Sequence, residues 1–254
     1  MAGTVEHFTA IYQRACQRKG GDTALKALTS KPLAPATLAQ LPDNQLLAEL
    51  TKKVFQSGFV WRVVRQKWPG FCELFFDFDI EKVLLLSDEM LEKKAADPRI
   101  IRNLSKVFTI RDNALMIFNV QQQEVQQQEV QQQEAQQQEV QQEQQSFARF
   151  IADWPTDNII GLWAYLKKHG ARLGGNTGPY ALRAIGKDTF LLTQDIEAYL
   201  RAYGVFDGGI NSQRSLKQIQ QQFNLWQQQS GLSLQEISQI VALSCGENYL
   251  GMQR

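Results

Sequence analysis

A single carboxylate, Asp195, follows a glycine-rich segment at a spacing that could support chemistry on a sugar. Asp195 is expected at the start of a helix, where the helix dipole favours its ionised form. A carboxylate held there can stabilise the positive charge that develops on a sugar as an N-glycosidic bond breaks, and it can orient a water molecule. A plain helix cap is the commoner role for aspartate at such a position, and Gln194 can share it.

The glycine-rich segment predicts a tight hairpin between two helices. An apolar-periodic helix ends at Gly170, and Gly174, Gly175 and Gly178 let the chain turn and expose amide N–H groups. Amides at the start of the helix that carries Pro179 can hold a phosphate oxygen, although most glycine-rich loops simply connect helices. The residues expected to contact a DNA backbone are Gly174, Gly175, Asn176, Thr177, Gly178, Lys167, Lys168, Arg172 and Arg102.

The hairpin lies in one of several sequence segments that carry a family resemblance. In chain order they are Gln56 to Trp61, Asp97 to Asn103 followed by Asn113-Ala114, Leu173 to Leu200, and Glu236 to Ser244. Together they resemble the DNA-3-methyladenine glycosylase I family, part of the helix-hairpin-helix base-excision glycosylase superfamily. The resemblance covers most of residues 41–118 and 146–246, and it favours the catalytic role of Asp195 over the cap.

This resemblance implies a monofunctional DNA glycosylase that hydrolyses the N-glycosidic bond of an alkylated purine, such as 3-methyladenine, in base excision repair. Relatives that also cut the strand carry a lysine nucleophile about 18 to 19 residues before the aspartate. Asn176 and Thr177 occupy those positions here. Two alternatives stay open, a catalytically silent DNA-binding or damage-sensing module and a glycosylase for another modified base.

The target base must leave the duplex and enter a pocket of aromatic and polar groups. Trp61 is the best stacking candidate, because an indole face attracts a cationic alkylated purine. A core tryptophan after a tight glycine turn is the alternative. The residues expected at the base pocket are Trp61, Phe59, Lys53, Glu49, Tyr12 and Tyr180.

Two features depart from the family pattern. Lys53 stands where the family has its base-reading glutamate, so either Lys53 faces a phosphate or the base preference differs. Glu49, one turn earlier on the same helical face, could partly substitute. His7, Cys16 and Cys245 do not supply the roughly four ligands that a zinc site needs, so we predict no metal and no cofactor.

Any binding of a polyanion must rely on local clusters of basic residues, because the net charge of the chain is only +1. Residues 51–68 and 99–111 each contain several lysines and arginines without one acid. A basic run is usually a solvated face. Together with the hairpin, these runs predict a stripe that faces double-stranded DNA carrying a damaged base.

The three cysteines are far apart and odd in number, which argues against a disulfide framework and favours a reducing compartment. No apolar run approaches the roughly 20 residues that span a bilayer, and no signal-peptide pattern is present. We therefore expect a soluble cytoplasmic monomer without a membrane partner. Phosphate-binding loops of nucleotide hydrolases and paired-histidine metalloprotease motifs are also missing from the sequence.

The predicted elements are all helical, and the 254 residues suffice for a packed core. We expect an all-α fold of two lobes with a groove between them. Lobe one is assigned mainly to 41–119 and 146–190, and lobe two mainly to 1–40 and 191–254. The expected helices span about 4–19, 43–56, 60–67, 71–76, 80–84, 87–95, 99–118, 146–152, 156–169, 178–186, 195–203, 212–229 and 233–244.

Residues 120–145 form a separate, low-complexity insertion in which a Gln-Gln-Gln-Glu-Val unit recurs. Five residues turn a helix by about 500°, so successive valines step by about 140° and form no stripe. The segment is expected to be a solvated helix that extends the preceding one, or a coil, and not a coiled coil. A partner-binding or aggregation role is the alternative to an expanded repeat in a permissive loop. Deleting 121–144 should leave folded protein that still binds DNA.

Overall fold

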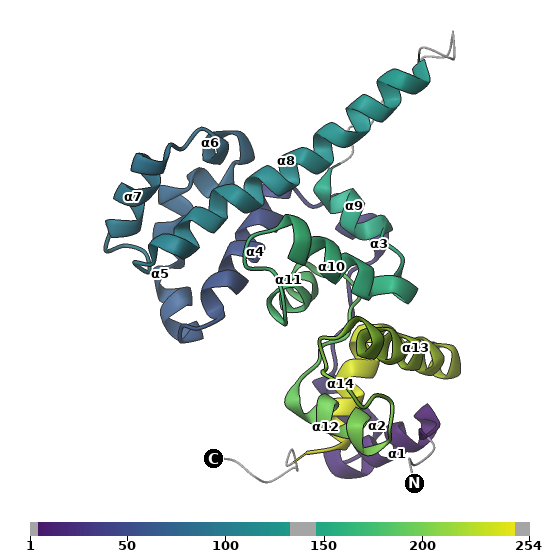
Figure 1. Cartoon of the computed structure of the whole chain (residues 1–254). Helices are drawn as coiled ribbons and strands as arrows, with labels where there is room; N and C mark the ends of the chain where they lie inside the picture. Colours follow the sequence, from purple (N-terminus) through teal and green to yellow (C-terminus); the bar gives the residue numbers. More distant parts are fainter. Residues whose placement is uncertain (1–4, 133–145, 247–254) are drawn as a thin grey trace. The chain divides into compact units, whose positions relative to one another are not determined.

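The structure, a computed structural model, describes residues 5–132 and 146–246. Every regular element in this part of the chain is helical, which confirms the all-α fold class (Figure 1). The chain folds as two compact units. The terminal unit comprises 1–33, 155–162 and 186–254, and the central unit comprises 34–154 and 163–185. Compared with the expected lobes, residues 34–40 fall in the central unit, and residues 155–162 and 186–190 fall in the terminal unit.

The terminal unit brings together the first and last helices of the described residues, since α1 packs against α14. Its helices are α1 (Phe8–Lys19), α2 (Asp22–Leu28), η2 (Thr156–Asn158), α12 (Gln194–Ala202), α13 (Gln213–Ser230) and α14 (Leu234–Ser244). Ile219, Phe223 and Trp226 form a buried stripe at helical spacing on α13, and Phe223 stacks on Phe190 with ring centroids 4.2 Å apart. Ser233 and Glu236 form a capping box at the start of α14.

A charged cluster ties α1 to α12 and α14 inside the terminal unit. The Arg14 guanidinium donates two hydrogen bonds to the Glu6 carboxylate at 2.9 and 2.7 Å, and the Tyr199 hydroxyl donates a third at 2.7 Å. Arg14 also donates to the Ser244 carbonyl. The Arg14 hydrogen bonds lower the pKa of Glu6 from 4.5 to about 2.

Replacing Glu6 by Gln should destabilise the protein at neutral pH and flatten its acid unfolding. Because the folded-state pKa of Glu6 is depressed, its stabilisation is present above pH 4.5 and is lost as the pH falls through about 2. The expected loss of unfolding free energy at pH 7 is about 1–3 kcal/mol. Urea unfolding at several pH values measures it, with Asp207→Asn, an exposed carboxylate, as the matched control. Equal pH profiles for Glu6→Gln and wild type would contradict the prediction.

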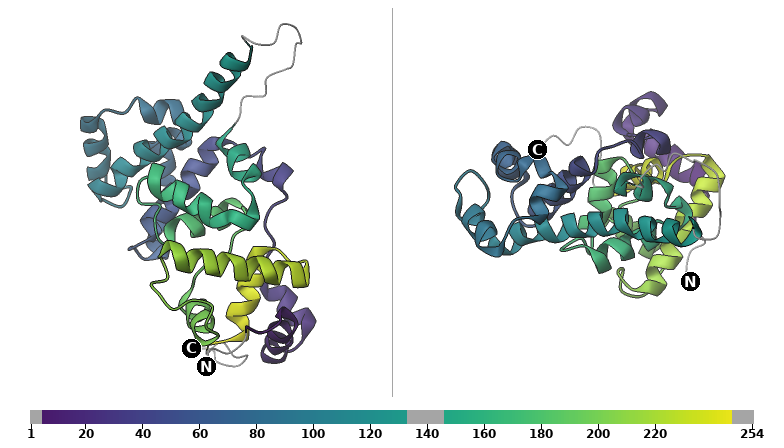
Figure 2. Two further views of the ribbon diagram at one scale, coloured as in Figure 1. Left: turned by 45° about the vertical axis from the view of Figure 1, so that its right-hand side comes forward. Right: turned by 90° about the horizontal axis from the view of Figure 1, so that it is seen from above.

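The central unit is built around α8, which runs alongside α6 and α7 and packs against α4 (Figure 2). Its other elements fill in around these helices. They are α3 (Pro35–Leu38), α4 (Asp43–Gln56), α5 (Trp61–Leu74), η1 (Phe76–Phe78), α6 (Ile80–Leu84), α7 (Asp88–Ala96), α8 (Leu104–Gln132), α9 (Phe147–Asp153), most of α10 (Ile159–His169) and α11 (Thr177–Ile185). Four phenylalanines form its aromatic core, Phe55, Phe71, Phe75 and Phe78, each at most 1% exposed.

Several helix limits differ from those expected. α5 continues through Pro69, where the sequence predicted a break between two helices. α8 begins at Leu104 and not at 99, because Asn103 caps it by accepting a hydrogen bond from the Lys106 amide at 3.0 Å. α2 and α3 were not predicted, since seven and four residues are too few for a clear helical period.

The glutamine-rich repeat begins inside the folded unit. Val120 is only 3% exposed, and the Gln121 side-chain amide donates to Asp43 at 2.6 Å. α8 continues to Gln132, as expected for a helix that extends the preceding one. The remainder of the repeat, 133–145, lies outside the described residues. A deletion meant to spare the fold should therefore start after Gln122 and not at 121.

None of the helices described is both long enough and apolar enough to cross a membrane.

Candidate functional site

The predicted hairpin joins α10 to α11 in the central unit. Gly175 has a φ of +59°, a conformation that favours glycine, and Gly175 and Asn176 are exposed at the tip. Gly178 is buried and donates its amide to the Leu173 carbonyl at 3.1 Å. A Cβ at Gly178 would lie 2.6 Å from that carbonyl oxygen, so only glycine fits the start of α11 without a shift.

A buried asparagine from α8 holds the base of the hairpin. Asn113 is fully buried, its Oδ1 accepts from the Ala171 amide at 2.8 Å, and its Nδ2 donates to the Ala171 carbonyl at 3.2 Å. The side chain thus pairs both backbone groups of one hairpin residue. In the sequence, Asn113 belongs to a segment that carries the family resemblance, but its hydrogen bonds to the hairpin were not predicted. A polar residue on the apolar face of a helix was the available signal.

Basic side chains surround the hairpin on the central unit. Lys167, Lys168, Arg172 and Arg102 are all exposed. Arg172 Nη2 donates to the Ser105 hydroxyl at 3.1 Å, which brings the hairpin to the start of α8. The structure therefore brings together the residues predicted to contact a DNA backbone. They lie in the hairpin loop, at the end of α10 and before α8.

Other basic residues of the predicted DNA-facing stripe are engaged within the protein. Arg99 pairs with Asp97 and Glu73, and Arg111 pairs with Asp88 and donates to the Leu86 carbonyl. Lys106 is 7% exposed and donates to the Val54 and Ser57 carbonyls, both at 2.5 Å. The stripe as predicted is wrong at Lys106, which is buried and bonded to carbonyls of α4 and the turn after it. Arg99 and Arg111 are paired with acidic side chains, and their place in the stripe stays a prediction.

Lys106 instead supports the turn that leads into α5. Its ammonium caps the carbonyl end of α4 and lies 5.1 Å from the ring centroid of Phe59. Phe59 is half-buried and stacks on Phe55. Burial lowers the pKa of Lys106. The turn before Trp61 is thus fixed by a residue that the sequence had assigned to DNA.

Trp61 is the first residue of α5 and is 49% exposed, so the alternative of a core tryptophan is wrong. The Lys53 ammonium lies 5.4 Å from the centroid of its ring. Burial lowers the pKa of Lys53, while the charge of Glu49 partly offsets this. Glu49 itself forms an ion pair with Lys52. The structure therefore brings Trp61 and Lys53 together, and Glu49 contacts a different lysine.

The two tyrosines expected at the base pocket lie in different units. Tyr12 belongs to α1 of the terminal unit and donates its hydroxyl to Asp22 at 2.5 Å, a contact that raises the pKa of Tyr12 to about 12. Tyr180 belongs to α11 of the central unit and is half-buried. Only Tyr180 shares a unit with Trp61.

Asp195 is the second residue of α12 and does not cap it. The Thr193 hydroxyl accepts from the Ile196 amide at 3.4 Å and is the N-cap, so the alternative cap roles of Asp195 and Gln194 are wrong. The Asp195 side chain is half-buried.

The last described residues lie directly against Asp195. Gly246 has a φ of +67°, and a Cβ there would lie 2.6 Å from Asp195 Oδ1. Burial and then the charge of Asp195 raise the pKa of Cys245 to about 11. Arg18 donates to the carbonyls of Cys245 and Gly246 and so holds this segment in place. Sequence reasoning missed Gly246 and Arg18, which no local pattern connects to Asp195.

Metal ligands were not expected, and the described ranges contain no group of three His, Cys, Asp or Glu side chains that could hold an ion. His7 caps α1 through its ring nitrogen, which accepts from the Thr9 amide at 3.3 Å. Cys16, Cys72 and Cys245 are free thiols. The absence of a metal stays a prediction that elemental analysis can test.

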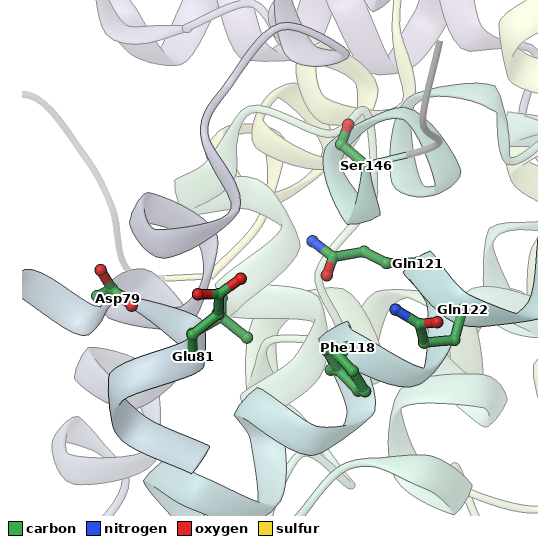
Figure 3. Close-up of a pocket in the computed structure, with 7 residues that line it drawn as sticks. Asp79, Glu81, Phe118, Gln121, Gln122 and Ser146 are labelled. Atoms are coloured by element: carbon green, nitrogen blue, oxygen red, sulfur yellow. The ribbon is translucent and has the colours of Figure 1, made fainter. Parts of the chain in front are cut away.

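A cavity of about 380 Å³ opens elsewhere in the central unit, between α6, α8 and the start of α9 (Figure 3). Its lining is mostly polar and includes two carboxylates. The lining residues are Asp79, Ile80, Glu81, Phe118, Gln121, Gln122 and Ser146. None of the predicted site residues lines this cavity, and its carboxylates would repel a DNA backbone.

The chain matches the methyladenine glycosylase family over residues 38–187, more than half of its length. This range contains both the Trp61 turn and the hairpin. No curated protein matches the chain.

Solved structures of 3-methyladenine DNA glycosylase I also match, at low similarity. One is 20% identical, covers 61% of this chain and 81% of its own, and has a TM-score of 0.44. A variant in complex with 3-methyladenine is 19% identical with 66% and 86% coverage and a TM-score of 0.47. The Staphylococcus aureus protein is 19% identical with 64% and 82% coverage and a TM-score of 0.46.

Proposed function

Because the chain belongs to the methyladenine glycosylase family, we propose that it releases an alkylated adenine from double-stranded DNA by hydrolysis and leaves the strand uncut. The observation that carries this proposal is the match over 38–187, which includes the hairpin and the exposed indole of Trp61.

The hairpin is proposed to bind the DNA backbone. Its exposed tip residues, Gly175 and Asn176, and the helix N-terminus behind them suit a phosphate oxygen. The exposed cations Lys167, Lys168, Arg172 and Arg102 add the charge that sequence-independent binding needs. Arg62 and Arg65, exposed on α5, are further candidates for phosphate contacts.

Trp61 is proposed to stack on the flipped base. A half-exposed indole at the first turn of a helix offers a flat apolar surface to a purine that has left the duplex. Phe59, held between Phe55 and the Lys106 ammonium, keeps the turn before Trp61 rigid. A rigid support matters because stacking depends on the orientation of the ring.

Asp195 is proposed to carry the chemistry. Its carboxylate would stabilise the sugar cation that develops as the base leaves and orient the attacking water. Support comes from its half-buried side chain and from Thr193, which leaves Asp195 without a capping duty. We further propose that the terminal and central units correspond to the two expected lobes, and that the protein acts as a cytoplasmic monomer.

Mass spectrometry of the bases released from methylated DNA tests the proposed reaction. We expect a methylated adenine in the supernatant and an intact strand that carries an abasic site. Asn176 and Thr177 provide no amine for a Schiff base, so borohydride should trap no covalent adduct. Release of no base, or a trapped adduct, would contradict hydrolysis without strand cleavage.

A further inference from the structure

The ammonium of Lys53 lies at the proposed base site without a hydrogen-bond acceptor among the described residues. It is placed over the ring of Trp61, 5.4 Å from the centroid. Its nearest acidic neighbour along α4, Glu49, is paired with Lys52. The Lys53 side chain is half-buried, so its three N–H donors are also partly withdrawn from water.

An ammonium in this position treats two kinds of base differently. A base that carries a fixed positive charge, such as 3-methyladenine in its nucleoside, would bring a second cation to the same indole. Like charges close together in a partly buried site are strongly unfavourable. A neutral base with an unsubstituted ring nitrogen would instead accept a hydrogen bond from Lys53, and hydrogen bonds from charged donors are the stronger ones.

We propose that Lys53 and Trp61 make this glycosylase select neutral alkylated adenines that carry a hydrogen-bond acceptor, such as ethenoadenine, over cationic ones such as 3-methyladenine. The inference rests on the proposed role of Trp61 as the stacking surface. Selection then combines one attractive contact with one repulsive contact at the same residue.

The neighbouring lysine shows that this arrangement is specific to Lys53. The Lys52 ammonium lies over a different ring, 4.6 Å from the centroid of Trp68, and its charge is paired with Glu49. Lys52 is therefore paired within the protein, whereas Lys53 has the charge of Glu49 nearby but no hydrogen-bond acceptor among the described residues. Lys52→Met is a matched control because it removes the same charge from the same helix.

The test compares release of ethenoadenine and 3-methyladenine from duplex DNA by wild type, Lys53→Met, Lys53→Glu and Lys52→Met. Wild type should prefer ethenoadenine in kcat/KM by about tenfold or more, and Lys53→Met should abolish that preference. Lys53→Glu should reverse it, because a carboxylate attracts the cationic base. Lys52→Met should keep the wild-type ratio, and thermal midpoints should confirm that all variants are folded.

A phosphate oxygen of the DNA backbone could accept the Lys53 hydrogen bond in place of the base. If Lys53 met a phosphate, Lys53→Met would weaken both substrates and undamaged DNA equally and leave the ratio unchanged. That result, or a wild-type preference for 3-methyladenine, would overturn the inference while leaving base release intact.

Calorimetric binding of free ethenoadenine separates this inference from the proposed reaction. Binding that weakens about tenfold in Lys53→Met but not in Lys52→Met supports recognition by Lys53. If wild type binds this base in that manner but releases none from DNA, the proposed hydrolysis fails and the recognition stands. If it releases bases but free ethenoadenine binds equally to all variants, the recognition fails.

Discussion

Asp195→Asn should reduce the rate of base release by about 10²–10⁴-fold while DNA affinity stays unchanged. The amide has nearly the shape of the carboxylate but no negative charge, so it cannot stabilise a cationic sugar. The helix is not expected to suffer, because Thr193 and not Asp195 caps α12. A large loss in kcat with an unchanged KM would identify an interaction made only in the transition state.

Glu197→Gln provides the matched control for this prediction. Glu197 lies in the same helical turn and pairs with Arg201 at 2.8 Å. The substitution therefore removes an equivalent charge from α12. Single-turnover release measures the chemistry, and fluorescence anisotropy with an undamaged duplex measures binding. Wild-type rates for Asp195→Asn would remove Asp195 from the mechanism.

Asn113→Ala should destabilise the protein by about 2–4 kcal/mol and weaken DNA binding. The substitution leaves the part-buried N–H and C=O of Ala171 without the side chain of Asn113, which is itself fully buried. It also empties part of the space beside Gly170, where a Cβ would lie 3.1 Å from Asn113 Oδ1. The base of the hairpin would lose its attachment to α8, and the tip its fixed orientation.

Urea unfolding and DNA titration together check this prediction. Leu115→Ala, a change at a 48% exposed position of the same helix, should alter the unfolding free energy by no more than about 0.5 kcal/mol. If Asn113→Ala unfolds and binds DNA like wild type, the two hydrogen bonds to Ala171 do not hold the hairpin. Wild-type stability with weakened DNA binding would contradict the expected loss of stability but support the positioning role.

Features with a local cause were predictable from the sequence. The stripe of Ile219, Phe223 and Trp226, the capping box at Ser233 and the hairpin glycines depend on residues within a few positions of one another. Helical periodicity and caps are properties of one segment, so they survive without knowledge of the rest of the chain. The short helices α2 and α3 were not predicted, because seven and four residues are too few to show a periodic pattern.

Charges with distant partners were not predictable. Arg99, Lys106 and Arg111 resembled a DNA-facing stripe, yet each finds acceptors within the protein, as Lys106 does at Val54 and Ser57. A lysine has the same appearance in a sequence whether it meets a carbonyl or a phosphate. Its role depends on which backbone groups packing leaves without partners.

The sequence by itself determined the helical class, the hairpin and the candidate groups, because these follow from periodicity, glycine conformation and residue chemistry. Only the tertiary structure decided that Trp61 is exposed with Lys53 over its ring, and that Gly246 lies against Asp195. Gly246 meets Asp195 only after packing brings together segments that are far apart in the chain. Such contacts arise from the balance of burial and hydrogen bonding across a whole unit, which no short stretch of residues encodes.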